Sequence, residues 1–342
     1  MREPDATAKL QLQFDDNSLL PMLYGEHDRH LARIEQHLGV QLSSRGNLLA
    51  IAGPHSASEA ARGALLALWE RLRRGQPIEL GDVDAAVRMA ASGGGNGEGP
   101  DLFGGEALIV RTKKRHVAPR TPGQAAYLRA LKDHELVFGV GPAGTGKTYL
   151  AVATAVELLT EGKVDRIVLS RPAVEAGERL GFLPGDMREK IDPYLRPLYD
   201  ALYDMLPGDQ VTKRLETGEI EVAPLAFMRG RPLANAYIIV DEAQNTTPMQ
   251  MKMLLTRMGE NSHMVVTGDL TQIDLPTHNV SGLRDALEVL EGMEGVAFIH
   301  FGHADVVRHE MVARIARAYD ERDGRQAELN LLPAAAKKRG RA

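Results

Sequence analysis

The sequence Gly141-Pro142-Ala143-Gly144-Thr145-Gly146-Lys147-Thr148 fits the phosphate-loop pattern G-x-x-x-x-G-K-[ST]. Its glycines allow the backbone to curl so that several N–H groups point at one anion. Lys147 supplies a cation for the β- and γ-phosphates of a nucleotide, and the Thr148 hydroxyl is the expected Mg²⁺ ligand. Residues 141–148 therefore predict a binding site for nucleotide phosphates.

The residues on either side of this loop have the patterns that such a site needs. Leu136 to Val140 is apolar and predicts a buried strand, and Tyr149 to Leu159 is apolar and alanine-rich, which predicts a helix. A strand, a glycine loop and a helix N-terminus together form an anion site. The alternative is a glycine turn that happens to precede a lysine. Average residue usage gives this pattern by chance in roughly one chain of this length in a hundred, so we favour the phosphate site.

Composition limits the possible classes of protein. The 342 residues are enough for two domains, and 44% hydrophobic with 25% charged residues is typical of a globular protein. A formal net charge of −5 gives no general attraction to nucleic acid, and the absence of cysteine excludes disulfides and thiolate metal sites. The N-terminus lacks a signal-peptide pattern, and no apolar run has the length of a membrane span. We expect a cytoplasmic protein that does not enter a membrane.

The chain divides into four predicted segments. Residues 1–91 predict a small α+β domain, in the order strand, helix, turn, helix, two strands, helix. Residues 92–105 contain a glycine-rich run that predicts a linker. Residues 106–322 predict an α/β nucleotide-binding domain with a mostly parallel sheet, and residues 323–342 a basic, disordered tail.

A second nucleotide signature follows the strand predicted at Tyr237 to Val240. An all-apolar strand is typical of the centre of a parallel sheet, and Asp241 and Glu242 come directly after it. We expect Asp241 to hold the Mg²⁺ that Thr148 also contacts, and Glu242 to orient or deprotonate the attacking water. A further strand over residues 263–267 leads to Gln272, which is expected to bond the γ-phosphate or that water.

Two other regions leave alternatives open. The basic run Arg111-Thr112-Lys113-Lys114-Arg115-His116, followed by Arg120, predicts either a solvated face or a contact with a nucleic-acid backbone. The stretch 172–207 is rich in glycine and proline but too apolar for a disordered loop. It predicts an ordered insertion of turns and short helices.

These motifs together resemble known ATPases. Residues 141–148, Asp241-Glu242-Ala243-Gln244 and Gly268-Asp269-Leu270-Thr271-Gln272 resemble motifs I, II and III of superfamily-one helicases. The segments at residues 170–178, 181–186 and 305–309 are similar to the PhoH family. The resemblance covers residues 106–320 and implies a RecA-like core that binds and hydrolyses ATP with Mg²⁺. The resemblance implies that the residues with these roles are Lys147, Thr148, Asp241, Glu242 and Gln272.

The first 91 residues resemble a KH RNA-binding domain, as in PhoH-like proteins that pair with a YbeY-type endoribonuclease in ribosomal RNA maturation. KH domains clamp nucleic acid with a G-x-x-G loop. Here the loop is Gly25-Glu26-His27-Asp28, and an aspartate in place of the second glycine repels phosphate. Both RNA binding and a role as an oligomerisation or docking module therefore remain open.

The helicase resemblance also implies roles for three further residues. In helicases, a glutamine at the position of Gln124 reads the adenine edge. The alternative is that Gln124 is a plain helix-surface residue. Helicases take a catalytic arginine from a second lobe, for which this chain has no residues. We therefore expect a homo-oligomeric ring, with a hexamer as one candidate, in which a neighbour donates Arg308 or, as second choice, Arg171.

The sequence therefore predicts an ATP-hydrolysing protein coupled to RNA. The alternatives are a nucleotide-gated scaffold for a nuclease and a phosphate-loop kinase of small molecules. Guanine is disfavoured as the base because the chain has no N-K-x-D element.

Overall fold

The computed structural model describes residues 7–92, 108–172, 187–276 and 279–307, together with Ile315. The chain divides into two compact units, Met1–Asp305 and Val306–Ala342. The glycine-rich run of the predicted linker and the basic tail lie outside the described residues. The boundaries of the four predicted segments stay a proposal.

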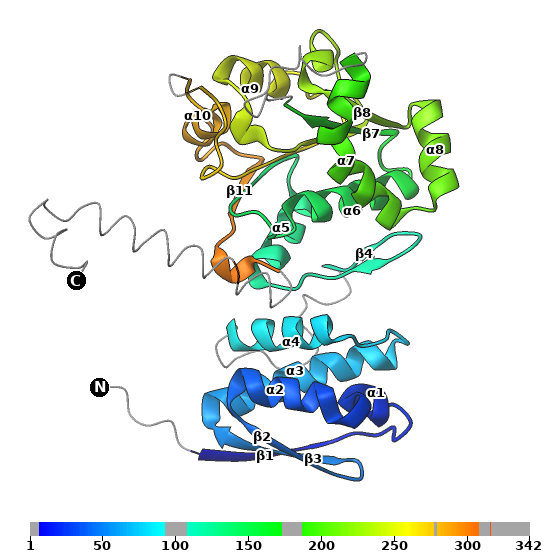
Figure 1. The fold of residues 1–342 in the computed structure, drawn as a ribbon, viewed down its shortest axis with the longest axis vertical. Helices are drawn as coiled ribbons and strands as arrows, with labels where there is room; N and C mark the ends of the chain where they lie inside the picture. The colour runs from blue at the N-terminus through cyan, green and yellow to red at the C-terminus, as the bar shows by residue number, and fades with distance from the viewer. Residues whose placement is uncertain (1–6, 93–107, 173–186, 277–278, 308–314, 316–342) are drawn as a thin grey trace, which may run out of the picture. The chain divides into compact units, whose positions relative to one another are not determined.

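Residues 7–92 form a small antiparallel sheet covered by helices (Figure 1). In chain order the elements are β1 (Thr7–Gln13), α1 (Leu20–Tyr24), α2 (Arg29–Leu38), β2 (Gln41–Arg45), β3 (Leu48–Pro54), α3 (His55–Arg73) and α4 (Leu80–Ser92). The sheet order is β1-β3-β2. The element order predicted from the sequence is therefore confirmed, with α4 as an additional helix. Helix α4 belongs here because its apolar residues Val83, Ala86 and Val87 are buried in the same core as β1 and β3.

The loop that corresponds to G-x-x-G contains three residues with positive φ. His27 and Asp28 have φ values of 54° and 57°, in the left-handed region that glycine adopts freely and aspartate tolerates. Gly25 has a φ of 75°, and a Cβ there would lie 2.8 Å from Cγ of His30. Asp28 therefore adds a carboxylate to a loop whose backbone is in the left-handed region.

The second part of the described chain contains a parallel sheet. Its six described strands are β6 (Leu136–Val140), β7 (Arg166–Arg171), β8 (Ile220–Pro224), β9 (Ala236–Val240), β10 (His263–Gly268) and β11 (Val296–His300). Their spatial order is β11-β6-β10-β9-β7-β8, and each neighbouring pair among them is parallel. The predicted α/β fold with a mostly parallel sheet is confirmed.

Helices cover both faces of this sheet (Figure 1). Helices α5 (Pro122–Asp133), α6 (Lys147–Thr160), α7 (Met187–Met205) and α8 (Gly208–Thr217) share one core with Ile167 and Ile239. Helices α9 (Pro248–Leu255) and α10 (Gly282–Val289) share the opposite core with Val168 and Ile238. Successive strand residues thus enter different cores, because side chains alternate along a strand. Burial on both faces explains why these strands read as continuous apolar runs.

Helix α7 differs from the prediction for this region. Turns and short helices were expected over residues 172–207, but residues 187–205 form one helix that continues through Pro193 and Pro197. A proline inside a helix costs about 3 kcal/mol. The apolar residues Leu195, Leu198, Leu202 and Met205 recur at helical spacing and are buried in the core, which offsets that cost. Residues 173–186 lie outside the described part of the chain.

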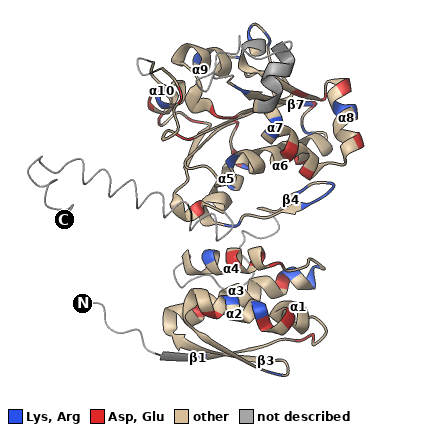
Figure 2. Ribbon diagram, in the orientation of Figure 1, with Lys and Arg blue, Asp and Glu red and all other residues tan. Residues whose placement is uncertain are grey.

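A short hairpin precedes α5. Its strands are β4 (Val110–Arg111) and β5 (His116–Val117), and the turn between them carries Lys113, Lys114 and Arg115. Figure 2 shows these basic residues gathered along the hairpin. Among the helices of the described residues, none combines the length and the apolar character needed to cross a bilayer.

Candidate nucleotide site

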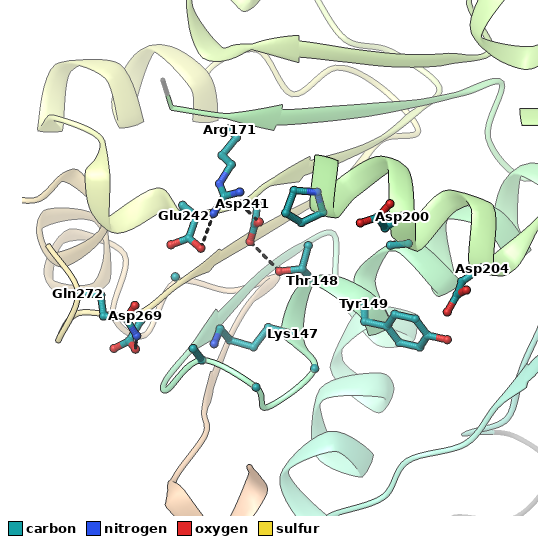
Figure 3. A pocket seen from close by; sticks show the side chains of 16 residues that line it. Lys147, Thr148, Tyr149, Arg171, Asp200, Asp204, Asp241, Glu242, Asp269 and Gln272 are labelled. Carbon is teal, nitrogen blue, oxygen red and sulfur yellow. Dashed lines mark hydrogen bonds and ion pairs between the residues drawn. The ribbon is translucent and has the colours of Figure 1, made fainter. Parts of the chain in front are cut away.

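The predicted motif residues meet in one cleft at the carboxyl ends of the parallel strands (Figure 3). This is the edge at which open α/β sheets bind their ligands. The cleft has a volume of about 550 Å³. Its walls contain residues of the phosphate loop, of the carboxyl ends of β7 and β10, of the segments after β9 and β10, and of α7.

The phosphate loop joins β6 to α6 and is held from behind by backbone contacts. Gly141 has a φ of 149°, and its N–H donates to the carbonyl of Gly268 at 3.0 Å. A Cβ at position 141 would collide with the carbonyl oxygen of Phe301, so only glycine fits there. Gly146 caps α6 without a side chain. The first N–H groups of that helix are therefore available to an anion.

Lys147 is folded over this loop. Its Nζ donates to the carbonyl oxygens of Gly141 and Pro142 at 2.7 and 2.8 Å, and the residue is only 8% exposed. Burial lowers the pKa of Lys147, although the carboxylates of Asp269 and Asp241 oppose this shift. An anion bound in the cleft would stabilise the charged form of the lysine.

Thr148 and Asp241 are brought together, as the prediction of a shared Mg²⁺ site requires. The Thr148 hydroxyl donates to Oδ1 of Asp241 at 2.7 Å, although the two residues lie 93 positions apart. Thr267, on β10 beside β9, donates to the same oxygen at 2.7 Å. Hydroxyl and carboxylate oxygens are the hard donors that Mg²⁺ prefers.

The donor set around this pair fits magnesium better than a metal held by protein alone. Within the described ranges there is no group of three or more His, Cys, Asp or Glu residues that is able to hold a metal ion. Mg²⁺ is usually bound by one or two protein oxygens, with water and substrate phosphates as its other ligands. Thr148 and Asp241 are the residues that would hold it here.

Glu242 lies directly after Asp241 in a strained conformation with a φ of 55°. Its Oε1 accepts from the Arg171 guanidinium at 2.7 Å, and its Oε2 accepts from Nε2 of Gln244 at 2.6 Å. Both carboxylate oxygens are therefore bound by side chains of the same chain. Sequence reasoning placed Glu242 in the site but missed both of these partners.

Gln272 also lines the cleft, next to a set of hydrogen bonds around Asp269. The Gln272 amide donates to Oδ2 of Asp269 at 2.7 Å, and Gln244 binds both the Gln272 carbonyl and the Asp269 N–H. Burial raises the pKa of Asp269, but hydrogen bonds from Thr271 and Gln272 outweigh this effect and lower it. Asp269 is thus an anion that positions Gln272.

Gln124 has partners other than the expected adenine. It is 5% exposed; its Oε1 accepts from the Arg120 N–H at 2.7 Å, and its Nε2 donates to the Thr145 carbonyl at 2.9 Å. Both ends of the amide are thus used by the backbone, each in one hydrogen bond. In this arrangement Gln124 supports the phosphate loop by its hydrogen bond to the Thr145 carbonyl.

Of the two candidate catalytic arginines, only Arg171 lies within the described residues. Arg308 lies outside the described residues. Arg171 was expected to reach a neighbouring subunit, but it points into the cleft of its own chain and pairs with Glu242. The reason is its position at the end of β7, which lies beside β9 in the sheet.

The cleft extends past the phosphate loop to a second end that sequence reasoning missed. It is formed by Tyr149 and by one face of α7 that carries the cleft-lining residues Pro197, Asp200, Ala201 and Asp204. Asp204 also pairs with Arg115 of the basic hairpin at 3.7 Å. Burial raises the pKa of Tyr149, and the Asp204 carboxylate acts in the same direction. The spacing of Asp200 and Asp204, four residues apart on a helix, was the available signal.

The chain is similar to several known proteins. A family model described as "PhoH-like protein" matches residues 116–320. The chain is 48% identical over 301 residues to a PhoH-like protein of Bacillus subtilis (strain 168), across 88% of this chain and 94% of that protein. It is 47% identical over 223 residues to Protein PhoH of Escherichia coli (strain K12), across 64% and 63%. A solved SWI2/SNF2 ATPase core of Sulfolobus solfataricus with dsDNA is 16% identical with a TM-score of 0.30, over 47% of this chain and 33% of that one.

Proposed function

The chain belongs to the PhoH family, and from this premise we propose that it binds ATP with Mg²⁺ in the cleft at residues 141–148 and hydrolyses the terminal phosphate bond. The observation that carries the proposal is the contact of 2.7 Å between the Thr148 hydroxyl and the Asp241 carboxylate beside the phosphate loop. A phosphate loop alone indicates an anion site. A hydroxyl and a carboxylate converging on one point add the Mg²⁺ ligands that nucleotide hydrolysis uses.

Each cleft residue then has a distinct task. The loop N–H groups and Lys147 bind the phosphates, and Mg²⁺, when bound, neutralises charge on the phosphate oxygens. Glu242 orients the attacking water and accepts its proton, while Gln272 holds the terminal phosphate or that water by its amide. Gln244 fixes the relative position of the two, because it contacts the Glu242 carboxylate and the Gln272 backbone.

The two ends of the cleft also define the direction of the nucleotide. Glu242 and Gln272 lie at one end, so the terminal phosphate belongs there. The nucleoside then extends past Tyr149 towards α7. Pro197 and Ala201 offer apolar surface to the base, and the Asp200 carboxylate accepts hydrogen bonds from ribose hydroxyls or an exocyclic amine.

Calorimetry on the full chain tests the proposal. We expect ATP to bind with Mg²⁺, and Lys147→Ala and Asp241→Asn to lose both this binding and phosphate release. Lys163→Ala is the matched control, because that lysine is exposed and pairs only with Glu161 among the described contacts. An intact, folded protein that takes up no adenine nucleotide would refute the proposal.

We extend the proposal to RNA as the molecule that stimulates hydrolysis. The support is the basic turn of the β4–β5 hairpin, whose Arg115 contacts Asp204 at the wall of the nucleotide cleft. A phosphate backbone bound at this turn would compete with Asp204 for Arg115. RNA binding would thereby change the contacts of Asp204, which lines the nucleotide cleft. We expect single-stranded RNA to raise the ATPase rate, and Lys113→Ala with Arg115→Ala to remove this stimulation while leaving the basal rate. An unstimulated ATPase would favour a nucleotide-gated scaffold instead.

Assembly and partners follow the same family premise. We propose a homo-oligomer in the cytoplasm that works with a YbeY-type endoribonuclease, with the KH-like residues 1–91 as the docking or RNA-binding part. Sedimentation of the full chain with ATP measures the subunit count. Copurification with the endoribonuclease, compared between the full chain and a variant lacking residues 1–91, measures the docking.

A further inference from the structure

Arg171 holds the site together in a way that the proposed reaction does not by itself explain. Its Nη2 donates to Oε1 of Glu242 at 2.7 Å, its Nη1 donates to the Tyr194 carbonyl at 2.8 Å, and its Nε lies 4.0 Å from Oδ2 of Asp241 (Figure 3). The Arg171 side chain is 20% exposed. A guanidinium with this little solvent access depends on its protein partners for hydrogen bonds.

The pairing with Arg171 opposes the task assigned to Glu242. A carboxylate that orients water needs its lone pairs free and its negative charge uncompensated. Here Arg171 compensates the charge and Gln244 occupies the second oxygen. The backbone of Glu242 is held in the left-handed region as well. The structure thus shows Glu242 in a paired form that is poorly suited to activate water.

The terminal phosphate of ATP is the group that can compete for Arg171. Arg171 lines the same cleft as Lys147 and Gln272, at the end where that phosphate belongs. A terminal phosphate carries more negative charge than a carboxylate, and it offers three acceptor oxygens. The planar guanidinium fork of arginine matches the spacing of these oxygens. ADP has no group at this place.

We propose that Arg171 is a positioning residue that exchanges Glu242 for the terminal phosphate, so that ATP but not ADP releases Glu242 for hydrolysis. The inference rests on the proposed function of the cleft. The exchange also affects α7, because Arg171 donates a hydrogen bond to the Tyr194 carbonyl of that helix. The arginine that stabilises the terminal phosphate is then supplied by the chain itself.

Binding of ADP and of β,γ-imido ATP to the full chain, both with Mg²⁺, tests the exchange. Arg171→Ala is expected to weaken the ATP analogue by roughly tenfold or more, with the ADP affinity unchanged within about twofold. Arg171→Lys keeps a cation but loses the fork, so a partial loss is expected. Arg166→Ala is the matched control, because Arg166 stands at the other end of the same strand and contacts the Ala234 carbonyl. It should change neither affinity.

A double-mutant cycle separates the exchange from simple charge repulsion. Glu242→Gln removes a negative charge near the phosphate and therefore raises the affinity for the ATP analogue in any case. If Glu242 also competes for Arg171, this gain is larger in the natural chain than in the Arg171→Ala background. Equal gains in both backgrounds would overturn the exchange.

The outcomes distinguish the two proposals. Equal losses for ADP and the ATP analogue in Arg171→Ala, or no loss at all, would overturn the inference while leaving a working nucleotide site. Failure of the natural chain to bind either nucleotide would refute the proposed function instead. If Arg171→Ala does not fold, the ratio of the two affinities in Arg171→Lys decides the question.

Discussion

Replacement of Gln124 by methionine separates support of the phosphate loop from recognition of the base. Methionine has nearly the same volume and shape as glutamine but cannot form either hydrogen bond of the amide. The variant therefore loses the contacts to the Arg120 N–H and the Thr145 carbonyl without leaving a cavity. If Gln124 supports the loop, every ligand that uses the loop is affected alike.

The magnitude follows from the burial of these contacts. Gln124 is 5% exposed, so water does not replace the lost bonds. A buried backbone group left without a partner costs about 1–3 kcal/mol, which gives about 2–6 kcal/mol for the pair. Most of this range lies below the free energy of about 5–15 kcal/mol by which native proteins are stable, so we expect the variant to fold. The loss disorders the phosphate loop in the free protein, and nucleotide binding must then order it again. If this ordering costs about 1.4 kcal/mol, nucleotide affinity drops about tenfold.

The assay compares ATP, GTP and inorganic tripolyphosphate by calorimetry, with Mg²⁺ throughout. We expect the affinities of all three to fall by the same factor, since the loop binds phosphates. Arg129→Ala, an exposed change on the same helix, should leave all three unchanged. Should ATP alone weaken while tripolyphosphate binds as before, Gln124 reads the adenine and its role in holding the loop is wrong.

Three further changes test the rest of the site. Because burial lowers the pKa of Lys147, the unfolded chain binds this proton more tightly. The free energy of unfolding of the free protein therefore rises with pH in the range just below 10.5, while ATP affinity falls there; Lys147→Arg should abolish both trends, as followed by thermal melts and titrations. Thr148→Ala removes the hydroxyl that faces Asp241, so the Mg²⁺-dependent part of ATP affinity should drop about tenfold, with Thr148→Ser retaining it and binding in EDTA unaffected. Gly141→Ala forces a Cβ against the Phe301 carbonyl at a φ of 149°, a strain of about 1–3 kcal/mol that should lower Tm by roughly 2–4 °C per kcal/mol; an unchanged Tm would contradict the packing.

Much of the site could be predicted because its residues lie in local patterns. The apolar runs of β6, β9 and β10 are continuous since both faces of the sheet are covered, and their carboxyl ends must share one edge. This placed the phosphate loop, Asp241 and Gln272 in one cleft before any contact was known.

The parts that escaped prediction depend on contacts between distant segments. Helix α7 continues through Pro197 because of a buried face that only the folded sheet provides. The direction of the Gln124 amide follows from the position of the Thr145 carbonyl, 21 residues away. The pairing of Arg171 with Glu242 spans 71 residues and requires β7 to lie beside β9. Sequence spacing carries no information on such choices of partner.

The position of Arg171 alters the reason for expecting an oligomer. A neighbouring subunit was invoked because a single RecA-like core offers no second lobe to supply an arginine to the terminal phosphate. In this fold the strand order places an arginine of the same chain at the end of β7, next to the acidic pair after β9. Together with Lys147, the cleft then contains two cations at its phosphate end without any neighbour. The chemistry of the proposed terminal-phosphate site therefore does not by itself demand a ring.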